Sequence, residues 1–412
     1  MNKDFFIGNR DTLVKGLEDN SILVLYAGES PHRSADSYHH YTPNRNFYYI
    51  TGIHRDKTIL MLSKRSGKIE STLFIERKDP MVEKWVGIKM SVEEAKEASG
   101  VENIKYIDEF KGAFAKALTL GFENLYMDLE RSNWDDPATM EQSFAKEVAA
   151  KYPGIRIKDI YHAICTQRLY KSQEELDCMK RAIDVTSKGI ENMMKNSKPG
   201  MYEYELEAYF DFTLTSNGIR EHAFPTIAAS GENGVILHYE TNSRKTEKNE
   251  LILCDLGAAY GYYSADITRT FPVGGKFTDR QKTIYNIVLK ALEETTKAVK
   301  PGMKLADLNN VTKGILTDGL KKIGLIKEDA ELSKYYYHGV SHYLGLDTHD
   351  VGDRELPLKP GVVVTVEPGL YIAEENIGIR IEDDVLVTES GYENLSKDII
   401  RKAEDIEAFM AK

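Results

Sequence analysis

The spacing of hydrophobic residues in the first part of the chain predicts alternating strands and helices. Runs rich in aliphatic and aromatic residues predict strands at 21–28, 57–63, 71–76 and 124–129. Residues 91–100 follow a helical period instead, and Ser91 and Glu94 have the spacing of a capping box at its start. This mixture indicates an α/β domain.

The pattern changes near residue 160. A short strand-like segment, IRIKDI, is followed by a long amphipathic helical pattern, whose start carries a second capping box formed by Ser172 and Glu175. We therefore expect a domain boundary between residues 158 and 172. The predicted domains are an N-terminal α/β domain, residues 1–160, and a C-terminal domain, residues 161–412.

The C-terminal domain contains an internal repeat. A helical pattern ends in KPGM at 198–201 and a second helical pattern follows; the same order recurs around KPGM at 300–303, and each helix pair leads into a strand-rich segment. Because Pro and Gly end helices in many proteins, KPGM alone is weak support for a repeat. Acidic residues also recur at corresponding places, which favours a domain with pseudo-twofold symmetry: Asp255 and Asp266 in the first half, Glu367 and Glu382 in the second.

The composition is that of an ordinary globular protein. Hydrophobic residues make up 42% and charged residues 29% of the 412 residues, enough chain for two or three domains. The net charge of −11 argues against a nucleic-acid-binding surface, which requires concentrated Lys and Arg. Three cysteines form no disulfide framework and are expected to be buried thiols in a reducing cytoplasm: Cys165, Cys178 and Cys254. The N-terminal residues lack the apolar core of a signal peptide, and no apolar run is long enough to span a bilayer.

Two aspartates lie inside a strand-forming segment, LILCDLGAAYGYYSADITRTF, where an unpaired carboxylate is costly. If this segment is a hairpin with a tight turn centred on Tyr260–Gly261, Asp255 and Asp266 lie directly opposite each other on one face. Glu367 and Glu382 flank a second turn-like stretch, so the same argument applies to them. Four acidic side chains on one face would repel each other unless cations lay between them, and carboxylates are favoured ligands of hard divalent metals.

Three histidines lie close together in the segment YYYHGVSHYLGLDTHD: His338, His342 and His349. A single histidine is more often a hydrogen-bonded core residue than a ligand, but three amid Gly, Ser and apolar residues favour a functional site. No HExxH zinc motif is present, and Gly339 and Val340 disfavour a helix. We expect one or more of these histidines to join the acidic cluster, and the residues alone leave open which.

Five segments together resemble a known family. ASGENGVILHYETN, CDLGAAYGYYSADITRTF, HGVSHYLGLDTHD, TVEPGLYI and GIRIEDDVLVT are similar, in this order, to the signature blocks of the pita-bread metallopeptidases, the family of methionine aminopeptidase, prolidase and aminopeptidase P. The long first domain and the HGxSH form are most similar to the Xaa-Pro aminopeptidases. The resemblance implies an α+β architecture, with a C-terminal pita-bread domain (a curved, pseudo-twofold antiparallel sheet covered by helices) and an N-terminal α/β domain of the creatinase type.

The resemblance also implies a dinuclear metal site. Asp255 would bind one ion, His342 and Glu367 the other, and Asp266 and Glu382 would bridge both. A hydroxide bridging the two ions would then remove an N-terminal residue from peptides with proline at the second position. The oxygen-rich ligand set suits two Mn²⁺ ions, with Co²⁺, Fe²⁺ and Zn²⁺ as alternatives.

Further residues match family positions around the substrate. The resemblance implies that Glu367 also carries the proton to the leaving proline nitrogen. It places His238 and His349 at the tetrahedral oxyanion or the bound peptide, and Arg380 at a family position around the substrate and the metal ligands, so the expected catalytic residues are Glu367, His238, His349 and Arg380. The expected substrate-binding residues are His338, which lines the pocket, and Tyr371, which supports it. Each of these, seen alone, is equally consistent with an ordinary buried hydrogen-bonding residue.

Other interpretations stay open. A prolidase, which cleaves only Xaa-Pro dipeptides, shares all five ligands, whereas a methionine aminopeptidase usually lacks the large first domain. A non-catalytic pita-bread binding module, or a metal-free hydrolase of the creatinase type, loses ligands that this chain keeps. The expected partners are Xaa-Pro peptides and further copies of the chain, in a cytoplasmic homodimer or homotetramer, with no nucleic acid and no membrane.

Overall fold

The computed structural model describes all residues, Met1 to Lys412, and the chain forms two compact units, Met1–Arg168 and Leu169–Lys412. The division falls after Arg168 rather than after residue 160. Helix α7 (Tyr161–Leu169) stays with the first unit because the buried Arg168 Nη1 donates to Asn46 Oδ1 at 2.8 Å. None of the helices combines the length and apolar character that crossing a membrane requires.

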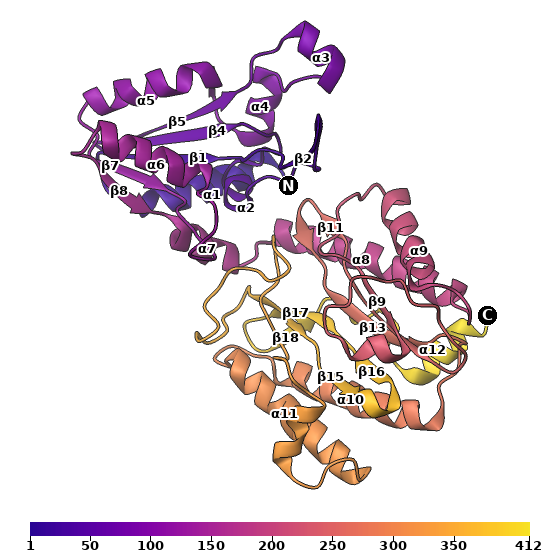
Figure 1. Cartoon of the computed structure of the whole chain (residues 1–412). Helices are drawn as coiled ribbons and strands as arrows, with labels where there is room; N and C mark the ends of the chain where they lie inside the picture. Colours follow the sequence, from indigo (N-terminus) through magenta and orange to yellow (C-terminus); the bar gives the residue numbers. More distant parts are fainter. The chain divides into compact units, whose positions relative to one another are not determined.

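The first unit is a mixed six-stranded sheet between helices (Figure 1). The strand order is β6-β5-β4-β1-β7-β8, and the four strands predicted from the sequence are β1, β4, β5 and β7. The strands are β1 (Ser21–Tyr26), β4 (Ile59–Arg65), β5 (Lys68–Ile75), β6 (Asn103–Tyr106), β7 (Asn124–Met127) and β8 (Arg156–Asp159). A separate two-stranded ribbon consists of β2 (His32–Ser34) and β3 (Ser37–Tyr38).

The helices of the first unit cover both faces of this sheet. On one face, the aromatic side chains of α5 (Phe110–Thr119) and α6 (Met140–Lys151) pack on Ile22 and Val24 of β1. On the other face, Lys64 Nζ donates to two carbonyls near the end of α1 (Lys3–Lys15). The remaining helices are α2 (Arg45–Thr51), α3 (Pro80–Val86), α4 (Val92–Ser99), whose predicted capping box is present, and η1 (Ile107–Glu109).

The second unit contains the predicted repeat of a helix pair followed by antiparallel strands. The first half comprises α8 (Gln173–Asn196), α9 (Glu203–Ser216), β9 (Ile227–Ser230), η2 (Gly231–Val235), β10 (Leu251–Leu256), β11 (Ala259–Tyr260), β12 (Tyr263–Ser264) and β13 (Ile267–Pro272). The second half comprises α10 (Asp279–Ala298), α11 (Leu305–Lys322), η3 (Asp329–Lys334), β14 (Val363–Val366), β15 (Gly369–Ile372), η4 (Ala373–Glu375), β16 (Ile377–Arg380), β17 (Asp383–Val387), β18 (Tyr392–Asn394) and the terminal α12 (Ala403–Met410).

The repeated helices bury one apolar stripe each against the strands. In α8 the buried residues Ile183, Ile190, Met193 and Met194 recur at helical spacing, and they share one continuous core with strands of both halves. The capping box predicted at Ser172 forms, and the corresponding helix of the second half starts with a capping box at Thr278.

The hairpin that carries the two aspartates has a different turn from the predicted one. Gly261 and Tyr262, with φ of 58° and 68°, connect β11 to β12, so the turn lies one residue later than expected. Asp255 therefore pairs with Thr268, and the prediction that it lies directly opposite Asp266 is wrong. Moving a turn by one residue shifts the pairing by two, so Asp266 stays on the same face as a diagonal neighbour of Asp255.

The second hairpin agrees with its predicted pairing. Val366, the last residue of β14, pairs with Asp383, the first residue of β17. The next step in this antiparallel register places Glu367 opposite Glu382. Both hairpins therefore bring two acidic residues to one face of the domain.

Candidate active site

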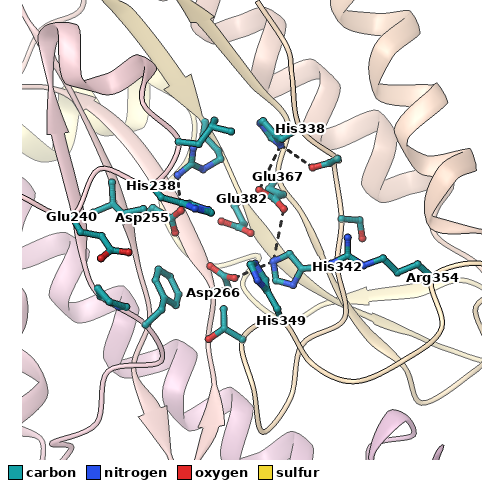
Figure 2. Close-up of a pocket in the computed structure, with 18 residues that line it drawn as sticks. His238, Glu240, Asp255, Asp266, His338, His342, His349, Arg354, Glu367 and Glu382 are labelled. Carbon is teal, nitrogen blue, oxygen red and sulfur yellow. Dashed lines mark hydrogen bonds and ion pairs between the residues drawn. The ribbon is translucent and has the colours of Figure 1, made fainter. Parts of the chain in front are cut away.

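A cavity of about 380 Å³ in the second unit collects most of the predicted functional residues. Its walls include His238, Asp255, Asp266, His338, His342, His349, Glu367, Arg380 and Glu382. The carboxylates and His342 point toward a common centre (Figure 2). Tyr371, which the sequence also singles out, is not on the wall but lies behind it.

The geometry at this centre is that of a ligand cluster. Asp266, His342 and Glu382 are buried, and their ligand atoms lie within 4.8 Å of one another. His342 Nε2 is 3.3 Å from Asp266 Oδ2 and 3.8 Å from Glu367 Oε1. Four of the five predicted ligands therefore surround one point, and Asp255 lies on the same sheet face.

The repeat explains why the acids converge. Asp266 immediately precedes β13, and Glu382 immediately precedes β17, so these two residues occupy the same place in the two halves. Asp255 lies near the end of β10, and Glu367 directly follows β14, so they too correspond approximately. Equivalent hairpins facing each other across the pseudo-twofold axis bring their acids to a shared centre.

Arg380 organises the wall next to the cluster. Its guanidinium donates to Asp255 Oδ2 at 2.5 Å, to Thr268 Oγ1 at 3.1 Å and to the Tyr371 hydroxyl at 2.9 Å. The Tyr371 hydroxyl in turn lies 2.8 Å from His338 Nε2. Arg380 thus holds one face of Asp255 and connects the cluster to His338, while Asp255 Oδ1 is buried with no partner.

The acids have pKa values that reflect burial without compensation. Burial, with the nearby charge of Asp255, raises the pKa of Asp266 to about 6, and burial raises the pKa of Glu367 to about 7. Burial and the charges of Asp266 and Glu367 raise the pKa of Glu382 well above its ordinary value. Burial alone would lower the pKa of His342, but its contact with Asp266 and the charge of Glu367 raise it to about 9.

These residues fit a pair of divalent cations. Without a cation, the raised pKa values keep protons on carboxylates that would otherwise repel each other. A bound cation would replace those protons, so metal binding and proton release are linked. The unpartnered Asp255 Oδ1 has the same explanation, since a buried carboxylate oxygen requires a donor or a cation. Four carboxylates and one imidazole form a hard, oxygen-rich ligand set.

His238 and His349 approach the centre from other segments. His238 lies just after η2 on the left wall of Figure 2, and His349 lies in the loop that follows His342. Burial and the charge of His342 lower the pKa of His349 to about 4, and burial lowers the pKa of His338 to about 4. The rings of His338 and His349 are therefore neutral near pH 7, and each has one N–H and one acceptor nitrogen.

The structure adds residues that the sequence did not single out. Thr268 Oγ1 donates to Glu382 Oε2 at 2.7 Å. Arg269, fully buried, donates to the Glu382 carbonyl at 2.6 Å and pairs with Asp383 at 2.7 Å. The signal for Thr268 was available, because a strand's period of two places it on the same face as Asp266. Arg269 acts through contacts with residues far along the chain, which no local pattern predicts.

A pseudo-twofold domain with buried carboxylates and an imidazole gathered at its centre defines a metallopeptidase of the pita-bread class. Comparison with known proteins agrees: the model of metallopeptidase family M24 matches residues 177–389, and the model of the aminopeptidase P N-terminal domain matches residues 6–126.

Individual relatives extend along the whole chain. The chain is 35% identical to the Xaa-Pro aminopeptidase of Escherichia coli (strain K12), over 98% of this chain and 97% of that protein. A solved Bacillus anthracis protein assigned as an aminopeptidase P has 54% identity and a TM-score of 0.98, covering 100% of this chain and 99% of that chain. Aminopeptidase P from E. coli, solved with the inhibitor Pro-Leu, has 34% identity and a TM-score of 0.92, covering 100% and 98%.

The chain belongs to metallopeptidase family M24 and, within it, to the Xaa-Pro aminopeptidases. The predicted architecture is confirmed, and so is the predicted activity, metal-dependent removal of an N-terminal residue that precedes proline.

Proposed function

We propose that the cluster holds two divalent ions, in preference Mn²⁺, with Asp266 and Glu382 shared between them. Asp255 would complete the site of one ion, and His342 and Glu367 that of the other. The observation that carries this proposal is the convergence of buried carboxylates whose charges Arg380 and His342 balance only in part, together with the unpartnered Asp255 Oδ1. Carboxylate and imidazole ligands are compatible with Mn²⁺, and Co²⁺, Fe²⁺ or Zn²⁺ fit the same donors.

The chain's own residues supply positioning and proton transfer. When bound, a pair of divalent ions activates water and polarises the peptide carbonyl. Glu367 reaches the cavity with 18% of its side chain exposed, which suits a group that receives a proton and passes it to the leaving proline nitrogen. His238 and His349 face the same cavity and would donate hydrogen bonds to the developing oxyanion or the bound peptide.

Substrate recognition follows from the same wall. His338 and Tyr371, connected to Arg380 by hydrogen bonds, would shape the part of the pocket that receives the proline ring. The Xaa-Pro bond has no N–H, so an enzyme that grips its substrate by backbone donors loses that contact. A site that acts on the peptide carbonyl through cations does not need a contact with the substrate N–H.

The test is an assay with Mn²⁺ on Ala-Pro-Ala, Ala-Pro and Ala-Ala-Ala, combined with metal analysis of the purified protein. We expect cleavage of Ala-Pro-Ala, about two bound ions per chain, and no cleavage of Ala-Ala-Ala. Cleavage restricted to Ala-Pro would instead identify a prolidase. A protein that binds no divalent ion would contradict the dinuclear site and favour a non-catalytic role.

A homodimer or homotetramer is also proposed. The support is a run of exposed apolar side chains in and after α3 of the first unit, including Trp85, 87% exposed, and Ile88, 77% exposed. Exposed apolar groups gathered in this way mark interaction surfaces. Light scattering on the intact chain and on a Trp85→Glu/Ile88→Glu variant tests this, since the unaltered chain should be an oligomer and the variant should dissociate.

A cytoplasmic location is proposed as well, because all three cysteines are buried thiols outside any disulfide, as is common for proteins of a reducing compartment. Fractionation of cells that produce the natural protein tests it.

A further inference from the structure

The imidazole of His349 lines the pocket but makes few contacts that fix its position. Its imidazole makes an edge-on contact with the ring of His342, with 4.4 Å between centroids, and no group of the chain forms a hydrogen bond with it. The position of this ring therefore depends on the backbone of the loop that carries it. Contacts that fix this loop therefore also fix the position of the His349 ring.

The loop is closed immediately beside His349. The backbone N–H of Asp350 donates to the Tyr343 carbonyl at 2.9 Å, so residues 343–350 form a closed loop directly after His342. Thr348 Oγ1 donates to the Ala223 carbonyl at 3.1 Å on the neighbouring segment. The base of the loop at Asp350 and the contact at Thr348 thus lie on either side of His349.

A buried ion pair anchors the base of this loop. Lys171 Nζ lies 2.9 Å from Asp350 Oδ2, and the two side chains are 0% and 1% exposed. Lys171 is itself fixed, since its backbone N–H donates to the Gly361 carbonyl at 2.8 Å and it directly precedes the N-cap Ser172 of α8. A fully buried pair loses so much solvation that its net stabilisation is small, and its best-attested use is to select one arrangement.

Gly345 makes room for this pair. A Cβ atom at position 345 would lie 2.1 Å from Asp350 Oδ2 and 2.9 Å from Lys171 Cε. The backbone at Gly345 is not in the left-handed region, so its conformation does not require glycine. The absence of a side chain is therefore required by space, and the space is occupied by the ion pair.

We propose that Lys171 is a positioning residue for the aminopeptidase reaction, which pairs with Asp350 to hold the loop that presents His349 to the bound peptide. The inference rests on the proposed role of His349. It assigns a function to a lysine that does not line the cavity.

The test is a double-mutant cycle on the Mn²⁺-loaded full chain with Ala-Pro-Ala. Lys171→Met is expected to lower kcat by roughly 10- to 100-fold with KM nearly unchanged, because a misplacement of about 1 Å can reduce a rate about 10²-fold. In a His349→Ala background, Lys171→Met should lower kcat by no more than about 2-fold, because the group it positions is already gone. A residue that merely stabilises the fold would not show this dependence on His349.

Matched variants keep the result interpretable. Lys180→Met removes an exposed ion pair with Glu393, 3.0 Å long, on helix α8, whose N-cap directly follows Lys171, and should leave kcat unchanged. Gly345→Ala forces the Asp350 carboxylate away from Lys171 without removing any charge, and should reproduce the loss of kcat if Lys171→Met fails to fold. Metal content and circular dichroism are measured on every variant.

Equal losses of kcat from Lys171→Met with and without His349, or full kcat in well-folded Lys171→Met and Gly345→Ala, would overturn the inference while leaving the proposed function intact. Full kcat in His349→Ala would refute the role of His349 and this inference with it. Failure of the unaltered chain to cleave Ala-Pro-Ala would refute the proposed function itself.

Discussion

At the scale of single residues, the acidic cluster is stable only with compensation. Asp266 and Glu382 are almost fully buried and lie within ligand distance of His342. Buried carboxylates that are close together cannot all stay ionised in a chain without cations. Asp266 and Glu382 occupy equivalent positions in the two halves, and we expect metal binding to depend most on them.

Asp266→Ala and Glu382→Ala are therefore each expected to abolish metal binding. We expect activity to fall by more than about 10²-fold, beyond the loss typical of groups that only support a ligand. Metal analysis and a peptide assay on the same preparation check this. Glu374→Ala, which removes an exposed acid of η4, is the matched control and should keep both metal and activity. Near-normal turnover by a folded Asp266→Ala or Glu382→Ala would contradict the shared-ligand assignment.

Arg380 is expected to act by orienting Asp255 rather than by binding metal. Its planar guanidinium serves Asp255, Thr268 and Tyr371 at once, and a lysine ammonium cannot reproduce that fork. Arg380→Lys should keep the fold but lower kcat/KM by about 10- to 100-fold, the range for residues that orient metal ligands. Steady-state kinetics at saturating Mn²⁺ measure this, and unchanged kcat/KM would show that Arg380 is not needed to orient Asp255.

Residue types alone drew attention to the four acids of the cluster, but not to the contacts that support them. Asp255, Asp266, Glu367 and Glu382 stand out because acids are unfavourable inside strands. Arg269 does not, because a single arginine in a strand carries no sign that it will be buried against Glu382 and Asp383. Contacts between distant segments become visible only when the fold places them together.

At the scale of elements, the two hairpins depend on close backbone approach. Gly257 lies opposite Asp266 in the first hairpin, and a Cβ there would be 1.8 Å from the Ala265 carbonyl. In the second, a Cβ at Gly378 would be 1.8 Å from the Gly234 carbonyl. Each glycine lets a strand approach closely enough to aim an acid or its support at the centre.

Gly257→Ala should force the strands apart beside Asp266. We expect a lower melting temperature and weaker metal binding together, measured by thermal unfolding and by titration with Mn²⁺. Gly314→Ala, in α11, is the matched control, since nothing lies within 4 Å of its Cβ position and Ala favours a helix by roughly 1 kcal/mol over Gly. A Gly257→Ala protein as stable as the Gly314→Ala protein would show that the hairpin tolerates the extra atom.

The turn of the first hairpin could not be placed correctly from the sequence pattern. A type I′ turn needs positive φ at both central residues, and its usual sequences end in Gly. Here Gly261 comes first and Tyr262 second, so the pattern pointed to a turn one residue too early. The long helix α8 was easier to predict, because the capping box at Ser172 and the apolar period that follows it agree with each other.

At the scale of the whole molecule, protonation of the cluster affects stability. Glu367 has a pKa raised to about 7, so its contribution is present at low pH and is lost as the pH rises through 7. His342 has a pKa raised to about 9, so its contribution is present below its ordinary value and is lost as the pH rises through 9. The Glu367 contribution is therefore almost lost at neutral pH, whereas the His342 contribution continues to fall up to about pH 9 and lowers the stability of the metal-free chain on the alkaline side of neutrality.

The metal-free chain should therefore melt at a lower temperature at about pH 9 than at about pH 6.5, by a few degrees, since about 1 kcal/mol corresponds to roughly 2–4 °C in a domain of this size. Mn²⁺ should raise the melting temperature more at the higher pH, because it displaces protons. Thermal unfolding with and without a chelator measures both. A flat or rising profile for the metal-free chain would contradict the direction assigned to His342.

The matching positions of Asp266 and Glu382 also bear on descent. A chain half as long as the second unit, with one helix pair and one hairpin, would supply two carboxylates, and two identical copies around a twofold axis would supply four. Joining the copies into one polypeptide removes the requirement that both sides be the same. His342 has no counterpart in the first half, and that asymmetry is available only to a fused descendant.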